Sequence, residues 1–341
     1  MAKKIVTFGE IMLRLAPDNY LRFNQVDHYE ATFGGAEANV CVSLSNYGYD
    51  TSFISILPNN DIAQCAINTL RKFNVNTDNI LRKGNRIGIY FCEKGASERP
   101  SKVIYDRKGS SISCAKLEDF DWDKIFDNAS WFHLTGITPA LGENLPNICM
   151  EALKKAKEKN INTSLDLNYR KKLWSKDEAK ESITKLCPYI DILISNEEDA
   201  KDVFGIEAKD TNIDDGKINV EGYKEVAKEL IEKYHFEKVA ITLRESFSAN
   251  DNAWSSVLYD NKNFYISKKY NMHIVDRVGG GDAFAAGLIS GFLDELNMQD
   301  IIEFASASSC LKHSIQGDFN LVSKEEVQSL VKGNIRGRVQ R

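Results

Sequence analysis

The segment DRVGGGD, residues 276–282, leads directly into AFAAGLISGFLDEL, residues 283–296. In the second stretch a large apolar residue recurs every four positions from Phe284 to Leu296, which predicts a helix. Glycines that enter a helix expose consecutive backbone N–H groups at the positive end of its dipole, an arrangement that binds phosphate oxygens. The segment therefore predicts an anion cradle formed by Gly279, Gly280 and Gly281.

Asp282 falls in the first turn of this predicted helix, next to the cradle. A carboxylate in that place would take the proton of a hydroxyl that attacks a phosphate, as phosphoryl transfer requires. A glycine turn with Asp282 as an ordinary helix N-cap explains the same residues equally well. Two other nucleotide motifs do not match. A dinucleotide fingerprint needs glycine where Phe284 stands, and no Gly-Lys pair continues into the Ser or Thr of a P-loop.

Outward from this segment, short apolar runs alternate with charged helical stretches. The runs of strand length are residues 5–8, 52–57, 131–134, 163–167, 190–195 and 238–243. The helical stretches are one that follows Gly34-Gly35 and closes at Gly48, then 61–73, 143–159, 175–187, 196–204 and 221–234. This alternation predicts an α/β fold whose parallel sheet is covered by helices on both faces. In such folds the ligand binds beyond the carboxyl ends of the strands.

Two segments interrupt the alternation. Residues 13–33 have no helical period, and residues 86–106 contain two strand-like runs, IGIYFCE and SKVIYDR, around the loop GASERP. Strands inserted in this way predict a small sheet that projects from the main domain as a lid, built from about 13–33 and 86–108. An antiparallel extension of the main sheet is the alternative.

Composition excludes several classes of protein. The 341 residues carry 44 Lys+Arg against 49 Asp+Glu, a net charge of −5, which disfavours nucleic acid as a partner. The seven cysteines are scattered without a C-x-x-C pair, and the five histidines are dispersed, so neither disulfides nor a zinc site are expected. No apolar stretch is long enough to cross a bilayer, and the N-terminus lacks a signal-peptide core. We expect a cytoplasmic protein without a membrane partner.

Four motifs in order resemble those of the ribokinase (PfkB) family of carbohydrate kinases. They are Gly34-Gly35 with Asn39, the segment DLNYR at 166–170, the segment SNEE at 195–198, and GGGDAFAAG at 279–287. The resemblance implies a ribokinase-like three-layer α/β/α sandwich over residues 1–330, followed by a basic tail at 331–341. It also implies ATP and Mg²⁺ as cofactors, and in some members a monovalent cation such as K⁺ beside the cradle.

The substrate class is inferred from charge. A sugar acid needs a guanidinium, because Arg pairs with a carboxylate in bidentate fashion, whereas a neutral sugar does not. Arg107 ends the second lid run and Arg170 follows the run at 163–167. The two arginines converge on one carboxylate if the lid folds over the sheet edge. Otherwise they are two solvated side chains on separate surfaces.

Within the family, the segments GGAEANV, YDRKGS, HLTGITPAL, DLNYRKKLW and TLRES resemble those of 2-keto-3-deoxygluconate kinases. That resemblance implies ATP-dependent phosphorylation of the C6 hydroxyl of 2-keto-3-deoxy-D-gluconate, with Asp282 as the base beside Gly279, Gly280 and Gly281. The implied substrate-binding residues are Gly34, Gly35, Asn39, Tyr90, Tyr105, Arg107, Arg170 and Asp318. The implied nucleotide-binding residues are Asn168, Arg170, Asn196, Thr242, Arg244, Glu245, Gly279, Gly281 and Ser306, with Glu198 near magnesium.

Three alternatives stay open at this point. The acceptor would be fructose or another neutral sugar, or the galacto epimer of the keto-deoxy acid, or the chain would be a sugar sensor without activity. Arg277 departs from the threonine common in the family, and it would either add charge near the phosphates or pair with a surface acid. Free edges of the lid strands predict a homo-oligomer.

Overall fold

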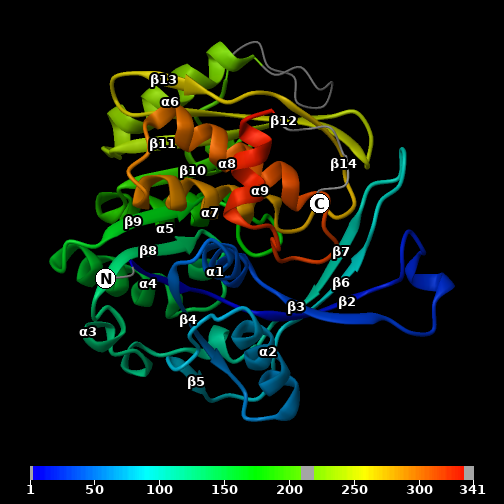
Figure 1. Ribbon diagram of the computed structural model, residues 1–341. Helices are drawn as coiled ribbons and strands as arrows, with labels where there is room; N and C mark the ends of the chain where they lie inside the picture. Colours follow the sequence, from blue (N-terminus) through cyan, green and yellow to red (C-terminus); the bar gives the residue numbers. More distant parts are fainter. Residues whose placement is uncertain (1–2, 209–218, 334–341) are drawn as a thin grey trace.

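In a computed structural model, which describes residues 3–208 and 219–333, the chain forms a central sheet between two layers of helices, with a second sheet beside them (Figure 1). The central sheet has the strand order β13-β12-β11-β10-β9-β8-β1-β4-β5, and β14 also pairs with β12. Its strands are β1 (Lys4–Phe8), β4 (Asp50–Leu57), β5 (Ile80–Arg82), β8 (Ala129–Thr135), β9 (Asn162–Asp166), β10 (Ile192–Asn196), β11 (Lys238–Ser246), β12 (Asp251–Tyr259), β13 (Phe264–Ile266) and β14 (Tyr270–His273). The pairings from β5 to β11 are parallel, and those of β12 are antiparallel.

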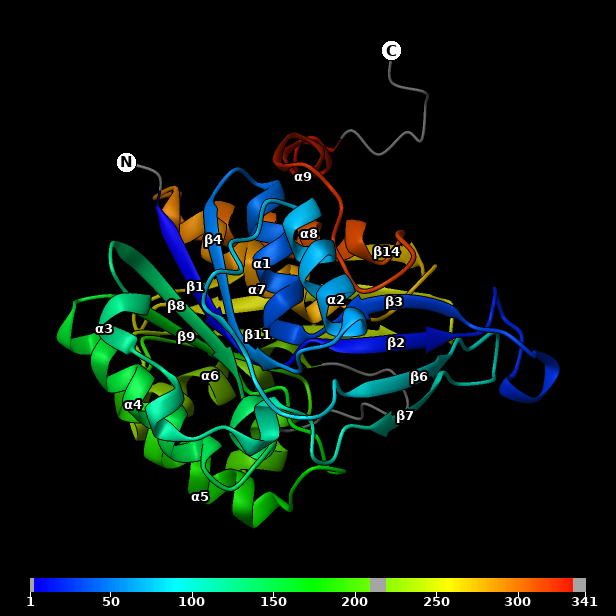
Figure 2. The same ribbon diagram turned by 90° about the horizontal axis from the view of Figure 1, so that it is seen from below.

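Helices cover both faces of this sheet (Figure 2). One layer contains α3 (Trp122–Ile125), α4 (Leu145–Glu158), α5 (Lys176–Leu186) and α6 (Val220–Tyr234). The other contains α1 (Ala36–Asn46), α2 (Asp61–Lys72), α7 (Gly280–Leu293), α8 (Met298–Lys312) and α9 (Lys324–Val331). Helix α7 is apolar almost all round and packs between the sheet and α8, so it is nearly completely buried. The N-terminus of α7 therefore lies next to the carboxyl ends of the central strands.

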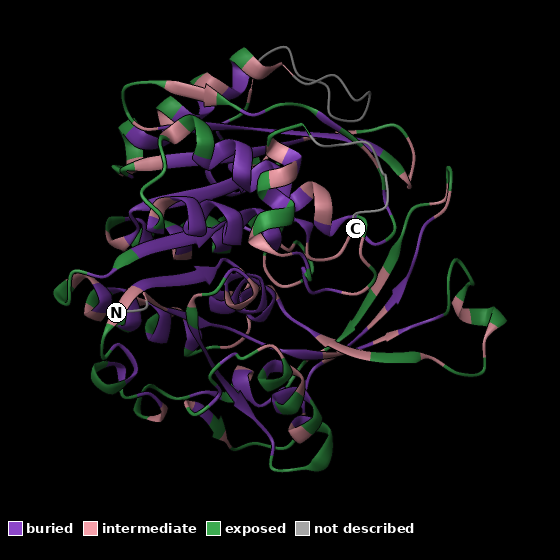
Figure 3. Ribbon diagram, viewed as in Figure 1, coloured by how far each residue is buried: buried purple, intermediate pink, exposed green. Residues whose placement is uncertain are grey.

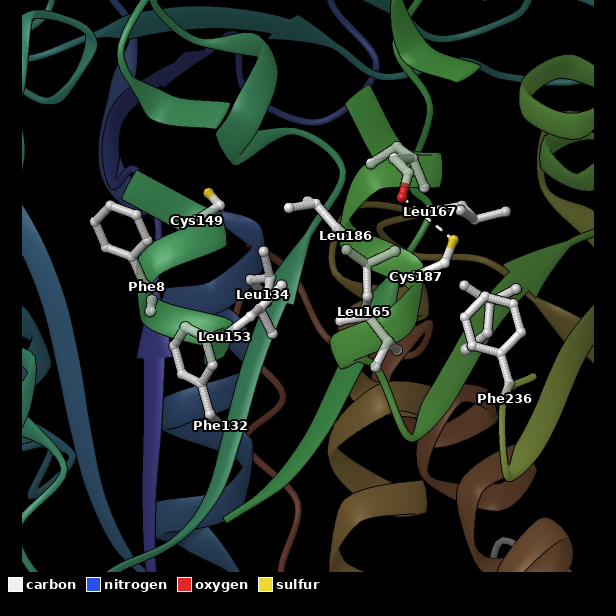
Figure 4. Packing of buried hydrophobic residues seen from close by; sticks show 14 of the residues in the cluster. Phe8, Phe132, Leu134, Cys149, Leu153, Leu165, Leu167, Leu186, Cys187 and Phe236 are labelled. Carbon is white, nitrogen blue, oxygen red and sulfur yellow. Dashed lines mark hydrogen bonds between the residues drawn. The ribbon is translucent and has the colours of Figure 1, made fainter. Parts of the chain in front are cut away.

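The first helical layer and the sheet share a large apolar core. Phe8, Phe132 and Leu134 from neighbouring strands meet Leu153 of α4 there, and Cys187 and Phe236 lie further along the same core (Figure 4). Burying apolar side chains of this size stabilises the fold by roughly 1.5–3 kcal/mol each. Colouring by burial shows the central strands almost entirely buried, while the outer ends of the projecting strands are exposed (Figure 3).

The second sheet is separate from the first and has the order β3-β2-β6-β7. Its strands are β2 (Met12–Ala16), β3 (Glu30–Gly34), β6 (Ile89–Glu93) and β7 (Lys102–Asp106). We call these four strands the lid; they project from one side of the main body (Figures 1 and 2). The lid is therefore a separate sheet and not an extension of the central one. Its inner face carries Met12, Ala16, Tyr90 and Cys92, which pack against Val278 of the segment before α7.

The α/β class and the sandwich with a small additional sheet are confirmed. The predicted helix at 196–204 is wrong over its first half, since only Ala200–Phe204 is helical, as a π-helical segment that ends at Gly205. The side chain of Asn196 accepts hydrogen bonds from the amides of Glu198 and Asp199, which turns the chain before the helical segment begins. The domain limits at 330 and the tail stay predictions, and residues 334–341 of that tail lie outside the described residues.

Candidate active site

The carboxyl ends of the central strands and the inner face of the lid enclose a cavity of about 470 Å³. Most of the residues expected at the site line it. They are Gly34, Gly35, Asn39, Tyr90, Tyr105, Arg107, Asn168, Arg170, Asn196, Glu198, Thr242, Arg244, Gly279, Gly280, Gly281, Asp282 and Asp318. These residues come from distant parts of the chain, so the fold brings the expected substrate and nucleotide positions into one space.

The glycine turn at the start of α7 forms one wall of this cavity. Gly279 has a φ of +85°, a left-handed conformation, and a Cβ there would lie 2.0 Å from the carbonyl oxygen of Asp318. No other residue type fits that position. Gly281 is exposed toward the cavity, and the amides of a first helical turn have no partner within the helix. The turn therefore presents backbone donors where an anion would bind.

Asp282 stands in the first turn of α7 and is 9% exposed. The amide of Asn39 donates to its Oδ2 at 2.7 Å, and the Asn39 Oδ1 in turn accepts from the backbone of Gly35 at 3.3 Å. Burial raises the pKa of Asp282 to about 7, with the Asn39 hydrogen bond opposing the shift and the charges of Asp318 and Glu37 adding to it. A carboxylate with this pKa is suited to accept a proton near neutral pH.

A row of side chains crosses the lid and reaches Asp318. Arg14, Tyr90 and Tyr105 are register neighbours on β2, β6 and β7. The guanidinium of Arg14 pairs with Asp318 and with Asp276, each at 2.7 Å, and the hydroxyl of Tyr90 also donates to Asp318. Burial opposes the charge on Arg14, but the two carboxylates outweigh it and raise the pKa of Arg14. Asp318 is thus fixed in place by two lid residues.

Arg107 and Arg170 both line this cavity, Arg107 just after lid strand β7 and Arg170 shortly after β9. Arg107 donates from Nε to Glu10 Oε2 at 2.7 Å, and its guanidinium lies 5.4 Å from the ring centre of Tyr105. Burial raises the pKa values of Asp166, Asp199 and Asp282, and the charge of nearby Arg170 partly opposes that rise in each. Two guanidiniums therefore line one space, and each already has acidic neighbours.

Two buried carboxylates at the strand ends add to the site. Burial and the charges of Asp199 and Asp282 raise the pKa of Asp166 well above its ordinary value, and burial raises that of Asp199 to about 6. Asn168 lies next to them and donates to Asp166. Glu198, expected near magnesium, is exposed at the cavity rim. Counted from Asn196, the acidic position of an N-x-x-E segment is Asp199, and both Asp199 and Glu198 line the cavity, so the placement of Glu198 near magnesium stays a prediction.

Two arginines gather where the nucleotide phosphates are expected. Arg244 and Arg277 both line the cavity, and Arg244 pairs with the buried Glu197 at 3.3 Å. Arg277 donates weakly to Asn252 at 3.4 Å and pairs with no acid among the described residues. Burial and the neighbouring Arg244 charge lower the pKa of Arg277 to about 10. Among residues 3–208 and 219–333, Arg277 therefore does not form the surface ion pair that was one of its two predicted roles.

Two of the expected nucleotide residues lie outside the cavity lining. Glu245 pairs with Lys269 at 2.6 Å, and Ser306 is fully buried between α8 and β12, where it contacts Ser256. Their roles stay predictions. Within residues 3–208 and 219–333, no group of three or more His, Cys, Asp or Glu is arranged to hold a metal ion. None of the helices in these residues combines the length and the apolar character that a membrane span requires.

Sequence reasoning missed several residues of the site. Arg14, Asp166, Asp199 and Glu10 hold or surround the expected groups, yet none was singled out for a role. Arg14 carried a signal, because it is the single charge in the run MLRLA, on the same face of the strand as Met12 and Ala16. A charge on the apolar face of a strand needs a buried partner, and those partners are distant in sequence.

Comparison with known proteins agrees with this architecture. Residues 2–322 match the model of the pfkB family of carbohydrate kinases. A 2-dehydro-3-deoxygalactonokinase from Haloferax volcanii is 30% identical over 337 residues, which cover 99% of both chains. A crystal structure of a 2-dehydro-3-deoxygluconokinase from Thermotoga maritima is 52% identical with a TM-score of 0.94, covering 97% of this chain and all of that one.

A more distant neighbour shares the fold alone. It is an Escherichia coli protein provisionally assigned as ribokinase II and solved with ATP and Mg²⁺, which has a TM-score of 0.79 at 17% identity and covers 97% of this chain and 99% of that one. With the family model matching nearly the whole length and the expected motifs meeting in one cavity, the chain belongs to the pfkB family of carbohydrate kinases.

Proposed function

We propose that the chain transfers the γ-phosphoryl group of ATP to the C6 hydroxyl of 2-keto-3-deoxy-D-gluconate. The observation that carries this proposal is the cavity itself, which has a glycine turn with Asp282 on one wall and two arginines, Arg107 and Arg170, on others. A neutral sugar gives no reason for two guanidiniums beside the acceptor site. The names of the two kinase relatives support the same acceptor class, since 2-dehydro-3-deoxy and 2-keto-3-deoxy describe one chemical group.

In the proposed reaction Asp282 acts as the general base. Asn39 occupies one of its carboxylate oxygens, so the other is left for the proton of the C6 hydroxyl. As that proton moves to Asp282, the hydroxyl oxygen forms a bond to the γ-phosphorus. The bond from phosphorus to the bridging oxygen breaks, and its electron pair stays on the β-phosphate of ADP. Base catalysis of this kind contributes about 10²–10⁴ in rate.

The remaining residues would bind and orient the two substrates. The amides of the Gly279–Gly281 turn would stabilise charge that develops on the transferred group, a contribution that is usually the larger one. Arg244 and Arg277 would meet the nucleotide phosphates, where Arg277 supplies a positive charge that a threonine would not. Thr242, Asn196 and Asn168 line the same region.

The lid side would recognise the sugar acid. Arg107 would bind its carboxylate together with Arg170, while Tyr90 and Tyr105 cover its carbons. A guanidinium has five N–H donors, so Arg107 can keep its hydrogen bond to Glu10 and still bind the carboxylate of the sugar acid.

The site fits Mg²⁺ only if the nucleotide supplies most of its ligands, because no protein cage is present among the described residues. Asp166, Glu198 and Asp199 line the cavity and would offer oxygen ligands to the ion, directly or through water. Bound with ATP, the ion would neutralise phosphate charge during transfer. A monovalent cation beside the turn stays a prediction of the family resemblance.

The galacto epimer of the acid is a second candidate acceptor, because the Haloferax volcanii relative bears that name. A fructokinase and a sugar sensor without activity are less consistent with the paired arginines and the buried base. We also propose a homo-oligomer formed through the lid edges. Because all seven cysteines are free thiols, we further propose that the protein works in a reducing compartment such as the cytoplasm.

The proposal is tested by ADP release with ATP-Mg and four acceptors in parallel: 2-keto-3-deoxygluconate, its galacto epimer, fructose and ribose. We expect turnover with the keto-deoxy acids only, and a loss of at least about 10²-fold in kcat for Asp282→Asn. Asp294→Asn, at the other end of α7, is the matched control and should keep its activity. Turnover of fructose would overturn the role of the arginines, and no turnover with any acceptor would favour the sensor.

A further inference from the structure

Lys312 is a buried cation that the proposed mechanism does not use. It is the last residue of α8, its side chain is 0% exposed, and its Nζ donates to the carbonyl of Ile315 at 3.1 Å. Burial lowers the pKa of Lys312 to about 8, with Asp276 and Asp318 opposing the shift, so the amine is mostly protonated at neutral pH. A buried ammonium is costly, and its retention calls for a specific environment.

That environment is the inner side of the glycine turn. A Cβ added at Gly279 would lie 3.1 Å from Lys312 Cε and 2.0 Å from the carbonyl oxygen of Asp318. The lysine stem and this carbonyl therefore both pack against the turn. Asp276, at the start of the same segment, accepts from the amides of Val278 and Gly317 and so ties the segment before α7 to the segment after α8.

The charged side chains around the turn form ion pairs with one another. Arg14 is shared between Asp276 and Asp318, and Lys94 lies 4.0 Å from Asp276 at the edge of the group. Lys312 is the cation in this set whose stem packs against the turn itself. Tyr90 bonds Asp318, and the neighbouring His313 has its pKa lowered to about 4 by burial and stays neutral. The Lys312 ammonium thus lies behind the anion cradle, bonded to the Ile315 carbonyl and close enough to Asp276, Asp318 and the second buried cation Arg14 to feel their charges.

An ordinary helix C-cap would explain part of this arrangement. Lysines at helix C-termini commonly bond the last carbonyls, as Lys312 does with Ile315. Such lysines keep the amine in water, whereas this one is fully enclosed. The cap alone gives no reason to bury the charge.

We propose that Lys312 is a built-in cation that positions the Gly279–Gly281 turn from inside the protein, so that this kinase works without a monovalent metal ion. An ammonium group has the same charge as K⁺ and about the same size, and it binds the same oxygen ligands. The inference rests on the proposed function, because the turn is taken as the phosphate cradle. Lys312 is a positioning residue, since it does not line the cavity.

The experiment compares the full-length wild type with Lys312→Met and Lys312→Gln in K⁺, NH₄⁺ and tetramethylammonium salts at equal ionic strength. Gln keeps a donor for the Ile315 carbonyl but removes the charge, so it separates capping from charge. Lys157→Met is the matched control, because Lys157 pairs with Asp191 on the opposite helical layer. Both kcat of ADP release and the melting temperature are measured, and the second readout does not depend on knowing the acceptor.

We expect the wild type and Lys157→Met to give the same kcat and melting temperature in all three salts. Both Lys312 variants should lose about 10-fold in kcat in tetramethylammonium, less than the direct loss of a cradle donor, and K⁺ or NH₄⁺ should restore part of it. Those ions should also raise the melting temperature of the variants but not that of the wild type.

Activation of the wild type by K⁺ would overturn the proposal, as would a Lys312→Gln variant whose kcat equals that of the wild type in tetramethylammonium. If neither variant folds, the wild-type salt comparison decides. If no acceptor is phosphorylated but K⁺ and NH₄⁺ still raise the melting temperature of the Lys312 variants, the proposed function is rejected and the role of Lys312 as a built-in cation is kept.

Discussion

At the scale of single residues, the protonation of Asp282 sets the pH dependence of the proposed reaction. A general base works only when deprotonated, and burial raises the pKa of Asp282 to about 7. We therefore expect kcat/KM to fall as the pH decreases below about 7 and to level off above it. A profile of kcat/KM from pH 5 to 9 measures this, and a plateau that extends down to pH 5 would contradict the assigned pKa.

The hydrogen bond from Asn39 stabilises the charged form of Asp282 and lowers its pKa. Asn39→Ala should raise that pKa further, which moves the acidic limb of the profile upward by about 1 pH unit. Asn46→Ala is the matched control, because Asn46 lies on the same helix and bonds the distant Asn320 carbonyl. A change in kcat without movement of the limb would show that Asn39 acts in another way.

Arg107 tests the recognition of a sugar acid. Lysine keeps the charge but cannot make the paired donation of a guanidinium, so Arg107→Lys should raise KM for 2-keto-3-deoxygluconate about 10-fold or more while kcat changes less. Steady-state kinetics on both parameters check this. Arg99→Lys, in the loop that joins lid strands β6 and β7 and paired with Glu93, should leave KM unchanged. An unaltered KM in Arg107→Lys would place the carboxylate elsewhere.

At the scale of elements, the lid is attached to the main body through a buried charge network. Arg14 on β2 bonds Asp276 and Asp318, both of which belong to segments beside α7. Arg14→Met would leave two buried carboxylates without this partner, and we expect it to lower the free energy of unfolding by roughly 3–5 kcal/mol. Denaturant unfolding measures the change. Arg99→Met, which removes a half-buried lid pair, should cost less than about 1 kcal/mol, and equal losses in the two variants would contradict the anchoring role.

At the scale of the whole molecule, the lid has two strand edges that pair with no other strand among residues 3–208 and 219–333. Strands β3 and β7 are its outer strands, and β7 exposes Ile104 by 43%. Unpaired edges with apolar side chains favour association with a second copy. Light scattering should give at least twice the 38.5 kDa of one chain, and Ile104→Lys should shift the mass toward the monomer. A wild-type mass of 38.5 kDa at micromolar concentration would reject the oligomer.

Local patterns in the sequence were enough to predict the α/β class, the separate lid, and the central strands β1, β4, β8, β9, β10 and β11, but not the short elements β5 and α3. Apolar periodicity sets these elements, and periodicity is visible in a single chain. The antiparallel edge β12–β14 was missed, because β12 is buried on both faces and shows no alternation. The helix at 196–204 failed because Asn196 bonds the backbone locally, which a helical pattern does not reveal.

The sequence by itself determined the glycine turn, the candidate base after it and the family motifs, because these depend on neighbours in the chain. Only the tertiary structure decided that Arg107 and Arg170 line one cavity, that Arg14 joins the lid to Asp276 and Asp318, and that Lys312 is enclosed behind the turn. These partners lie up to about three hundred positions apart in sequence. Burial and charge pairing at such separations arise when the strands assemble, so no local pattern records them.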